Sequence, residues 1–207
     1  LSYRKAIELK PDFADAHSNL GNILRDIGKL KEAELSQRKA IELKPDFADS
    51  HYNLGGILSD LGKLKESFDS YLRVIEINPT YPNIYSFITV FLRDSTPSKL
   101  NKSKLRKILS ILLEKNDVPH RELIRAFNFV YSNDIITNLE KFNSDLSKIN
   151  ILTNDKIIIN SLKKIIFCDL KLEKVLTKVR RNICKRIAYN REPINQSELE
   201  FHCGEIQ

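Results

Sequence analysis

Two histidines and two asparagines recur at one spacing and are the clearest candidates for chemistry in this chain. His17 and Asn19 are followed 34 residues later by His51 and Asn53. An amide group carries both a donor and an acceptor, so it can bind the backbone of a peptide of any sequence. The histidines are too far apart to share a metal ion, and we interpret them as partly buried packing residues. The pattern therefore indicates binding rather than catalysis.

An internal repeat must position these side chains. Residues 10–43 and 44–77 are identical at 21 of 34 aligned positions, and residues 1–9 match residues 35–43 as a leading half unit. A degenerate third unit begins at residue 78. A repeat of this period is typical of a solenoid, whose stacked units form an extended concave binding surface.

Each unit is predicted to contain two helices, over about 15–27 and 30–43 in the first unit. Pro11 suits a helix start, where its missing N–H is not needed, and Gly28 ends the first helix. A glycine inside a helix costs about 1 kcal/mol relative to alanine, so a repeated helical glycine predicts a close approach of two helices. The structural positions of the repeat are Leu20, Gly21, Ala33, Ala40, Pro45, Leu54, Gly55 and Pro79.

This pattern resembles the tetratricopeptide repeat (TPR). The family favours Trp-x-x-Leu-Gly-x-x-Tyr in its first helix, followed by Ala, Phe or Tyr, Ala and Pro. The matching residues are His17, Leu20, Gly21, Leu24, Ala33, Gln37, Ala40 and Pro45 in the first unit, and His51, Leu54, Gly55, Leu58, Ser67, Tyr71, Val74 and Pro79 in the second. The resemblance implies that the first helix of each unit lines a groove.

Repeats with the sequence HSNLG are also similar to those of the O-linked N-acetylglucosamine transferase superhelix. There a ladder of asparagines holds an extended peptide backbone, and the resemblance implies the same role for Asn19 and Asn53. The alternative is that these amides only cap or solvate their helix. A carboxylate-clamp groove is not expected, because the corresponding positions carry no lysine or arginine. The predicted groove residues are Asn19, Asn22, Asn53 and Asn83.

We therefore expect an all-α fold, a TPR solenoid over residues 1–95 continued by an irregular helical region over 96–207 that caps it. Residues 95–98 should form a break and supply the N-cap of the next helix, which carries an apolar stripe from Leu105 to Leu113. Further helices are predicted at 120–131, 134–149, 154–167 and 172–189, with another starting near Ser197.

The excess positive charge of the chain lies outside the repeats. Residues 1–95 carry 13 basic and 14 acidic side chains, whereas residues 96–207 carry 21 and 13. One helical stripe offers a candidate anion-binding face for RNA or an anionic membrane; the alternative is an ordinary solvated face. No aromatic residues alternate with its charges and no RNA-binding motif is present, so we do not expect nucleic acid as a partner. The stripe consists of Lys174, Lys178, Arg181 and Lys185.

The second half also resembles a family, on the segments RELIRAFNFVYSNDIITNLEKF (121–142) and SLKKIIFCDLKLEKVLTKVRRNICKRIA (161–188). They look like the helical middle region of long cyanobacterial TPR proteins, which an S-adenosylmethionine-dependent methyltransferase domain often follows. The chain has no Met and begins inside a repeat, so we expect a fragment of a longer protein. An enzyme domain, if there is one, would lie beyond Gln207.

Motifs for other functions are absent from the sequence. Cys168, Cys184 and Cys203 form no CxxC pair, so no metal site is expected, and such scattered cysteines fit a reducing, cytoplasmic location. No P-loop, Gly-x-Ser-x-Gly or His-Glu-x-x-His occurs, so we expect neither catalysis in this segment nor a cofactor. No apolar run approaches the length of a membrane span. The sequence leaves the oligomeric state open.

Three hypotheses for function follow. The first is a protein-interaction scaffold whose groove binds an extended peptide or a partner helix. The second is the non-catalytic, substrate-presenting part of a larger methyltransferase or glycosyltransferase. The third is an RNA or anionic-membrane adaptor that acts through the basic second half.

Overall fold

The structure is a computed structural model that describes residues 2–132 together with Asn160, Lys164, Lys174, Thr177 and Arg181. The chain divides into two compact units, residues 1–88 and 89–207, and each is described by itself. Every regular element among the described residues is helical. The predicted all-α fold is therefore confirmed for this part of the chain.

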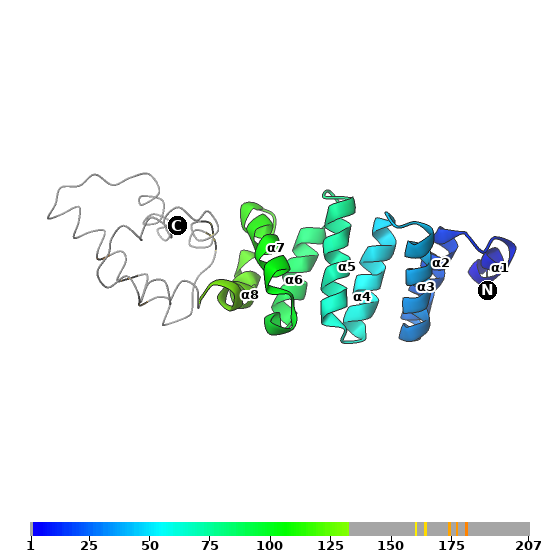
Figure 1. Cartoon of the computed structure of the whole chain (residues 1–207), viewed down its shortest axis with the longest axis horizontal. Helices are drawn as coiled ribbons and strands as arrows, with labels where there is room; N and C mark the ends of the chain where they lie inside the picture. Colours follow the sequence, from blue (N-terminus) through cyan, green and yellow to red (C-terminus); the bar gives the residue numbers. More distant parts are fainter. Residues whose placement is uncertain are drawn as a thin grey trace. The chain divides into compact units, whose positions relative to one another are not determined.

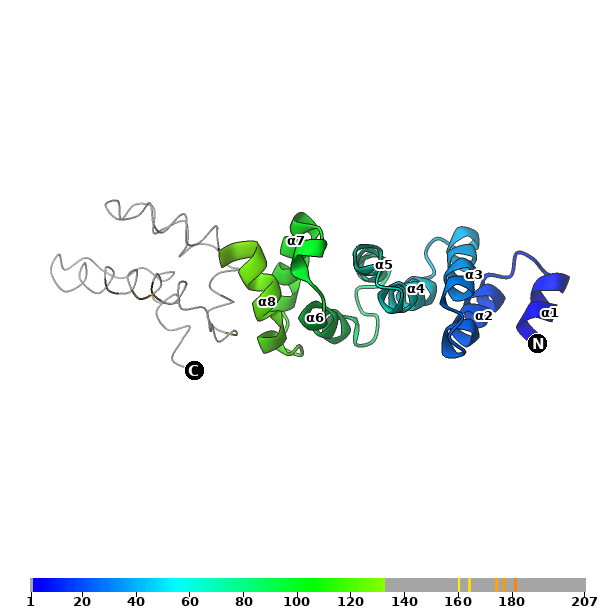
Figure 2. The same ribbon diagram turned by 90° about the horizontal axis from the view of Figure 1, so that it is seen from below.

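The first unit is a series of helices connected by short turns (Figure 1). The helices of each repeat pack against each other, α2 on α3 and α4 on α5, and α3 also packs on α4. Figure 2 shows α3 and α5 along one side of this unit and α2 and α4 along the other. This is the helix-turn-helix stack of a solenoid, as the sequence repeat predicts. The helices are α1 (Ser2–Leu9), α2 (Ala14–Asp26), α3 (Leu30–Leu43), α4 (Ala48–Asp60), α5 (Leu64–Ile77) and the beginning of α6 (Ile84–Asp94).

Glycine makes the same turn between the two helices of both units. Gly28 and Gly62 have φ angles of 77° and 73°, a left-handed conformation that glycine adopts without a steric penalty. The following amide returns to the helix, with Lys29 N–H donating to the carbonyl of Leu24 at 2.8 Å. Lys63 repeats this hydrogen bond in the second unit. The sequence therefore ends both first helices with the same left-handed cap.

The two repeated histidines secure the turn that precedes each first helix. The Nε2 atom of His17 lies 3.0 Å from the carbonyl oxygen of Pro11, and that of His51 lies 2.9 Å from the carbonyl oxygen of Pro45. A carbonyl oxygen can only accept, so Nε2 carries the proton in both imidazoles. Burial lowers the pKa of His51, which favours the neutral imidazole with its one proton on Nε2. Both side chains are partly buried and hold the turn to the helix.

The core of the first unit runs between successive repeats. Leu24, Ala33 and Ile57 form a buried cluster, and Leu20 and Leu61 pack against it. Because Ile57 belongs to the second repeat and the other two buried residues to the first, this cluster joins the repeats into one stack. The interior is thus built from repeat-to-repeat contacts, as a solenoid requires.

The described part of the second unit contains η1 (Pro97–Lys99), α7 (Lys102–Glu114), η2 (His120–Leu123), α8 (Ile124–Phe127) and the π-helical turn η3 (Asn128–Ser132). The apolar stripe that the sequence predicts from Leu105 to Leu113 lies on α7 and is buried. Its members are Leu105, Ile108, Leu109, Leu112 and Leu113.

Two predictions for the second unit were wrong in detail. The N-cap of α7 is Asn101, whose side chain accepts the N–H of Lys104 at 3.0 Å. Ser95 instead follows the last residue of α6, and its buried hydroxyl donates to the carbonyl of Leu92. The single helix predicted over 120–131 is a succession of 3-10, α and π turns. The helices predicted from residue 134 onward lie outside the described residues, apart from the five isolated positions given above.

Candidate functional site

One face of α2 and α4 carries the repeated asparagines, and we call it the first-helix face. Residues three and four apart share one side of a helix, which places Asp49 beside both Tyr52 and Asn53. Asn19 is exposed and Asn53 partly buried. Neither side-chain amide forms a hydrogen bond within the described residues, so both donors and acceptors remain available. The members of the first-helix face are Asp15, Asn19, Asn22 and Asp26 on α2, and Asp49, Tyr52, Asn53 and Asp60 on α4.

Asn22, also predicted in the groove, is partly used inside the protein. Its Oδ1 accepts a hydrogen bond from Nε2 of Gln37 at 2.8 Å. Gln37 is fully buried, and the same nitrogen donates to the backbone carbonyl of Ser18 at 2.9 Å. This amide therefore joins α2 to α3, and the NH₂ group and one lone pair of Oδ1 of Asn22 are left to meet a ligand.

Asn83 lies in a different structural position from the other asparagines. It precedes α6 in a left-handed conformation with φ of 58°, and its carbonyl accepts the N–H of Phe87 at 2.9 Å. In the repeat register Asn83 corresponds to Asp15 and Asp49, whereas Phe87 corresponds to Asn19 and Asn53. The repeated asparagine position is thus occupied twice and is then replaced by an aromatic ring.

The helical glycines lie opposite large side chains of the second helix of their repeat. A Cβ atom on Gly21 would meet the end of the Gln37 side chain at 2.8 Å. On Gly55 it would meet the ring of Tyr71 at 2.5 Å. Among the other structural positions, Ala33, Ala40 and Leu54 are buried, Leu20 is partly buried, and Pro45 and Pro79 are exposed in turns.

A charged network joins α3 to α5. Glu34 accepts hydrogen bonds from Lys63 at 2.8 Å and from Arg38 at 2.9 Å, and Arg38 also reaches Glu66 at 2.7 Å. Burial alone would raise the pKa of Glu34, but the hydrogen bonds from Lys63 and Arg38 outweigh it and lower the pKa below its usual value. The network uses these charges to stabilise the stack and leaves them less available to a partner.

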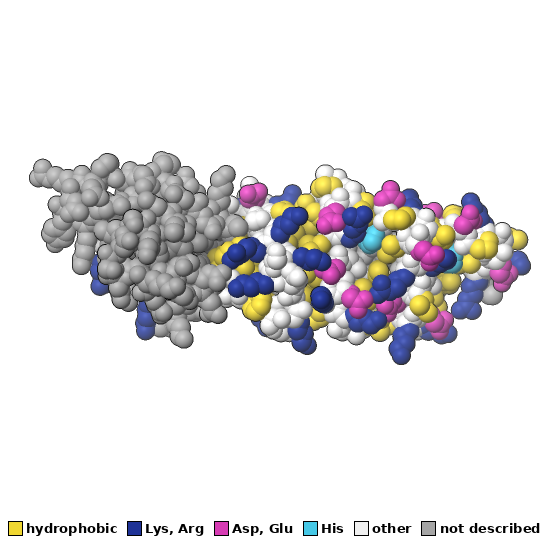
Figure 3. Space-filling model, in the orientation of Figure 1, with side chains coloured by type: hydrophobic (Ala, Val, Ile, Leu, Met, Phe, Trp, Pro, Cys, Tyr) yellow, Lys and Arg dark blue, Asp and Glu magenta, His cyan; other side chains and the backbone are white. Residues whose placement is uncertain are grey.

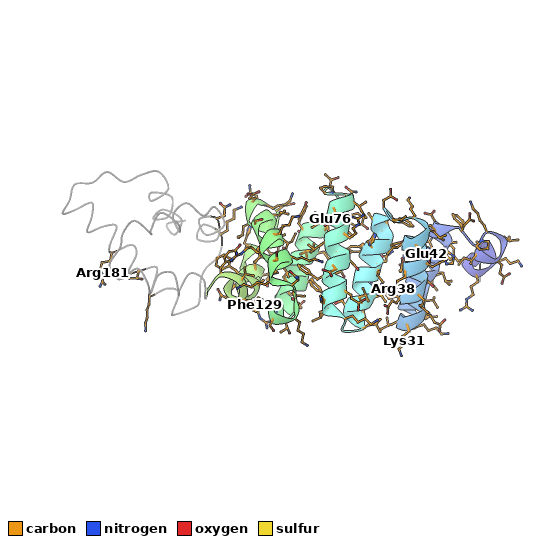
Figure 4. All side chains as sticks on the ribbon, viewed as in Figure 1. Lys31, Arg38, Glu42, Glu76, Phe129 and Arg181 are labelled. Atoms are coloured by element: carbon orange, nitrogen blue, oxygen red, sulfur yellow. The ribbon has the colours of Figure 1, made fainter. Side chains whose placement is uncertain are left out.

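A cleft of about 480 Å³ lies on the opposite side of α4 from Asn53. Its floor includes Leu54 and Leu58, which fall on the far side of the helix from the first-helix face. Its rims come from α3 and α5 and carry charges of both signs, and Figure 3 shows basic and acidic side chains interspersed over these helices. Figure 4 shows Arg38 and Glu42 extending from α3 and Glu76 from α5. The lining of this cleft mixes basic, acidic and apolar side chains, so it does not favour one class of ligand.

An aromatic cluster beside Asn53 was not identified from the sequence. The ring of Tyr52 on α4 lies 5.5 Å from that of Tyr81 and 5.3 Å from that of Phe87, between ring centroids. Tyr71 lies beneath them, 4.9 Å from Phe87. Tyr52, Tyr81 and Phe87 are partly exposed, whereas Tyr71 is buried. The repeat pattern does not predict this cluster, because Tyr52 and Phe87 stand where the preceding units have Ser18 and Asn53. Phe87 at the asparagine position was nevertheless a usable signal.

The candidate anion-binding face stays a prediction. Lys174 and Arg181 are helical and exposed, and Lys178 and Lys185 lie outside the described residues. No group of three or more His, Cys, Asp or Glu among the described residues is placed to hold a metal ion. None of the helices in the described part of the chain has the length and apolar character needed to cross a membrane.

Taken together, the stacked helix pairs define a helical-repeat solenoid, a class whose surfaces bind other proteins. Known families then specify the repeat: the TPR repeat family matches residues 1–24 and 21–59, and the tetratricopeptide repeat family matches residues 48–81. Residues 1–81 of this chain are therefore tetratricopeptide repeats, a protein-interaction module.

Among the solved structures that match this chain is one of a TPR protein. It is the crystal structure of YrrB, described as a TPR protein with an unusual peptide-binding site, at 18% identity and a TM-score of 0.45, covering 100% of this chain and 91% of that one. The chain matches no curated protein significantly.

Proposed function

We propose that this chain is a protein-interaction scaffold whose first-helix face binds a segment of another protein in extended form. The observation that carries the proposal is the pair of amides of Asn19 and Asn53, which occupy equivalent positions 34 residues apart. Both lack hydrogen-bond partners within the described residues and lie on α2 and α4, neighbouring first helices of the stack. An extended backbone repeats its donors and acceptors, so equivalent amides on successive helices can bind it in register.

The charges elsewhere on the first unit favour this face over the α3–α5 side. The cleft on that side is rimmed by Arg38 and Glu66, which already bind each other at 2.7 Å. A ligand there would have to replace an existing ion pair, whereas the amides of Asn19 and Asn53 would exchange only water for peptide. The first-helix face therefore has the lower desolvation penalty.

A random peptide library displayed on phage tests the proposal. The whole chain is immobilised, and peptides enriched by the wild type are measured again on an Asn19→Ala/Asn53→Ala variant. We expect capture to fall by about tenfold or more, because two amides lose up to four hydrogen bonds to the peptide backbone. A Lys31→Ala/Lys65→Ala variant is the matched control, since these exposed lysines are also 34 residues apart but lie on α3 and α5.

Circular dichroism must show the same helix content and melting temperature in all three proteins. Equal capture by the asparagine variant and the wild type would refute the proposal, as would an equal loss in the lysine variant.

A further inference from the structure

The first-helix face is acidic. Its helices α2 and α4 contain Asp15, Asp26, Asp49 and Asp60, against a single cation, Arg25. The Nε atom of Arg25 donates to Asp60 at 2.7 Å, so this pair is neutral. The other three carboxylates form no ion pair within the described residues. A peptide on this face therefore meets a surplus of negative charge, which favours a basic partner.

One of these carboxylates lies beside the aromatic cluster. The hydroxyl of Tyr81 donates to Oδ1 of Asp49 at 2.8 Å, which brings the carboxylate to the rings of Tyr81 and Tyr52. Asp49 and Tyr52 are three residues apart on α4 and share its exposed side. The hydrogen bond leaves Oδ2 of Asp49 without a partner among the described residues. The result is a carboxylate oxygen next to partly exposed aromatic faces.

This combination suits one kind of side chain. A guanidinium group is planar, stacks on aromatic faces and hydrogen-bonds to carboxylates, whereas an ammonium group is a compact and more strongly hydrated charge. We propose that Asp49, Tyr52, Tyr81 and Phe87 form a pocket for an arginine side chain of the bound peptide. The inference rests on the proposed function and specifies which side chain the bound peptide must carry.

The chain supplies an internal control, because the equivalent site one repeat earlier has the acid and only one of the three rings. Asp15 occupies the position of Asp49 one repeat earlier. There Ser18 replaces Tyr52, Asn53 replaces Phe87, and Phe47, which has no hydroxyl group, replaces Tyr81 in the register. The proposal therefore assigns the arginine to the second repeat alone, next to the amide of Asn53.

Peptides enriched from the random library by the wild-type chain provide the test. Arginine should be over-represented at one position, and replacing it by the neutral isostere citrulline should weaken binding by about tenfold in fluorescence polarisation. With Asp49→Asn, which keeps an oxygen for the Tyr81 hydroxyl, or with Tyr52→Leu, the arginine and citrulline peptides should bind within about twofold of each other. Asp15→Asn should retain the tenfold preference.

The outcomes separate this inference from the function on which it rests. If peptides are enriched without arginine, or arginine and citrulline forms bind the wild type equally, the pocket is refuted and peptide binding stands. An Asp15→Asn variant that loses the preference as fully as Asp49→Asn would also refute the pocket, because general charge would then explain it. If the wild type enriches no peptide, the proposed function fails and the pocket fails with it.

Discussion

Replacing Gly55 by alanine should destabilise the chain, although alanine is the better helix former. The added Cβ would lie 2.5 Å from Cε1 of Tyr71 and 2.8 Å from two further ring atoms. Carbon atoms in ordinary contact are about 3.5–4.0 Å apart, so the ring must retreat by roughly 1 Å. Tyr71 is only 1% exposed and its ring packs against Phe87 at 4.9 Å, which leaves it little room to move.

Overpacking of this kind typically costs about 1–3 kcal/mol, and the helix preference for alanine returns about 1 kcal/mol. We therefore expect a net loss of about 1 kcal/mol, or a fall in melting temperature of about 4–8 °C for the first unit, residues 1–88. Urea unfolding of the whole chain, followed by far-UV circular dichroism, measures the difference.

Two variants show whether the Tyr71 ring is the cause. In a Tyr71→Leu background the clash is gone, so Gly55→Ala should become neutral or stabilising by up to about 1 kcal/mol. Gly21→Ala should remain destabilising in the Tyr71→Leu background, because its Cβ would meet the hydrogen-bonded amide of Gln37 at 2.8 Å and not the ring of Tyr71. If Gly55→Ala stabilises the wild type, or behaves the same with and without Tyr71, the packing argument is wrong.

Three further changes have definite signs. The hydroxyl of Ser50 is buried without a partner and its repeat equivalent is Ala16, so Ser50→Ala should raise the free energy of unfolding by up to about 1 kcal/mol; a loss in urea titration would contradict this. The lowered pKa of Glu34 means that its contribution is present above its unfolded pKa, about 4.3, and is lost as the pH falls through its folded pKa. Glu34→Gln should therefore be less stable than the wild type at pH 7, with the gap closing towards pH 3; a gap that is constant with pH would exclude this origin. Asn101→Ala should lower stability by about 0.5–2 kcal/mol through loss of the cap on the Lys104 N–H, with hydrogen exchange in α7 as the readout and unchanged protection as the contrary result.

Local signals predicted the helices of the repeats well. Gly28 allowed the end of the first helix to be placed, because a left-handed residue is needed there and glycine supplies it. The second helix was predicted at 30–43 and is Leu30–Leu43. A repeated sequence must make the same local structure twice, so each unit confirmed the pattern of the other.

Contacts between distant residues could not be read from the sequence. Gln37 occupies the position where the TPR pattern favours Phe or Tyr, but its buried amide binds Ser18 and Asn22. The pairing of Tyr81 with Asp49 spans 32 residues and depends on where a turn places one ring. Neither contact has a periodic signal, since each is set by how the helices pack and not by spacing along one of them.

Several predictions stay predictions. The role of Asn19, Asn22, Asn53 and Asn83 as groove residues depends on a ligand, and so does any anion-binding role for the basic stripe. The cytoplasmic location and the link of the second half to a methyltransferase domain likewise rest on the sequence patterns and the resemblance alone. Binding experiments on the whole chain address the first two directly.

The most direct test of the central claim is an NMR titration of the ¹⁵N-labelled chain with a peptide enriched by the wild type. The side-chain NH₂ resonances of Asn19 and Asn53 can be assigned from Asn→Asp variants, and the account predicts that both shift and saturate together as peptide is added. Shifts confined to residues that line the opposite cleft, such as Arg38 and Arg73, with the two amides unchanged, would contradict it.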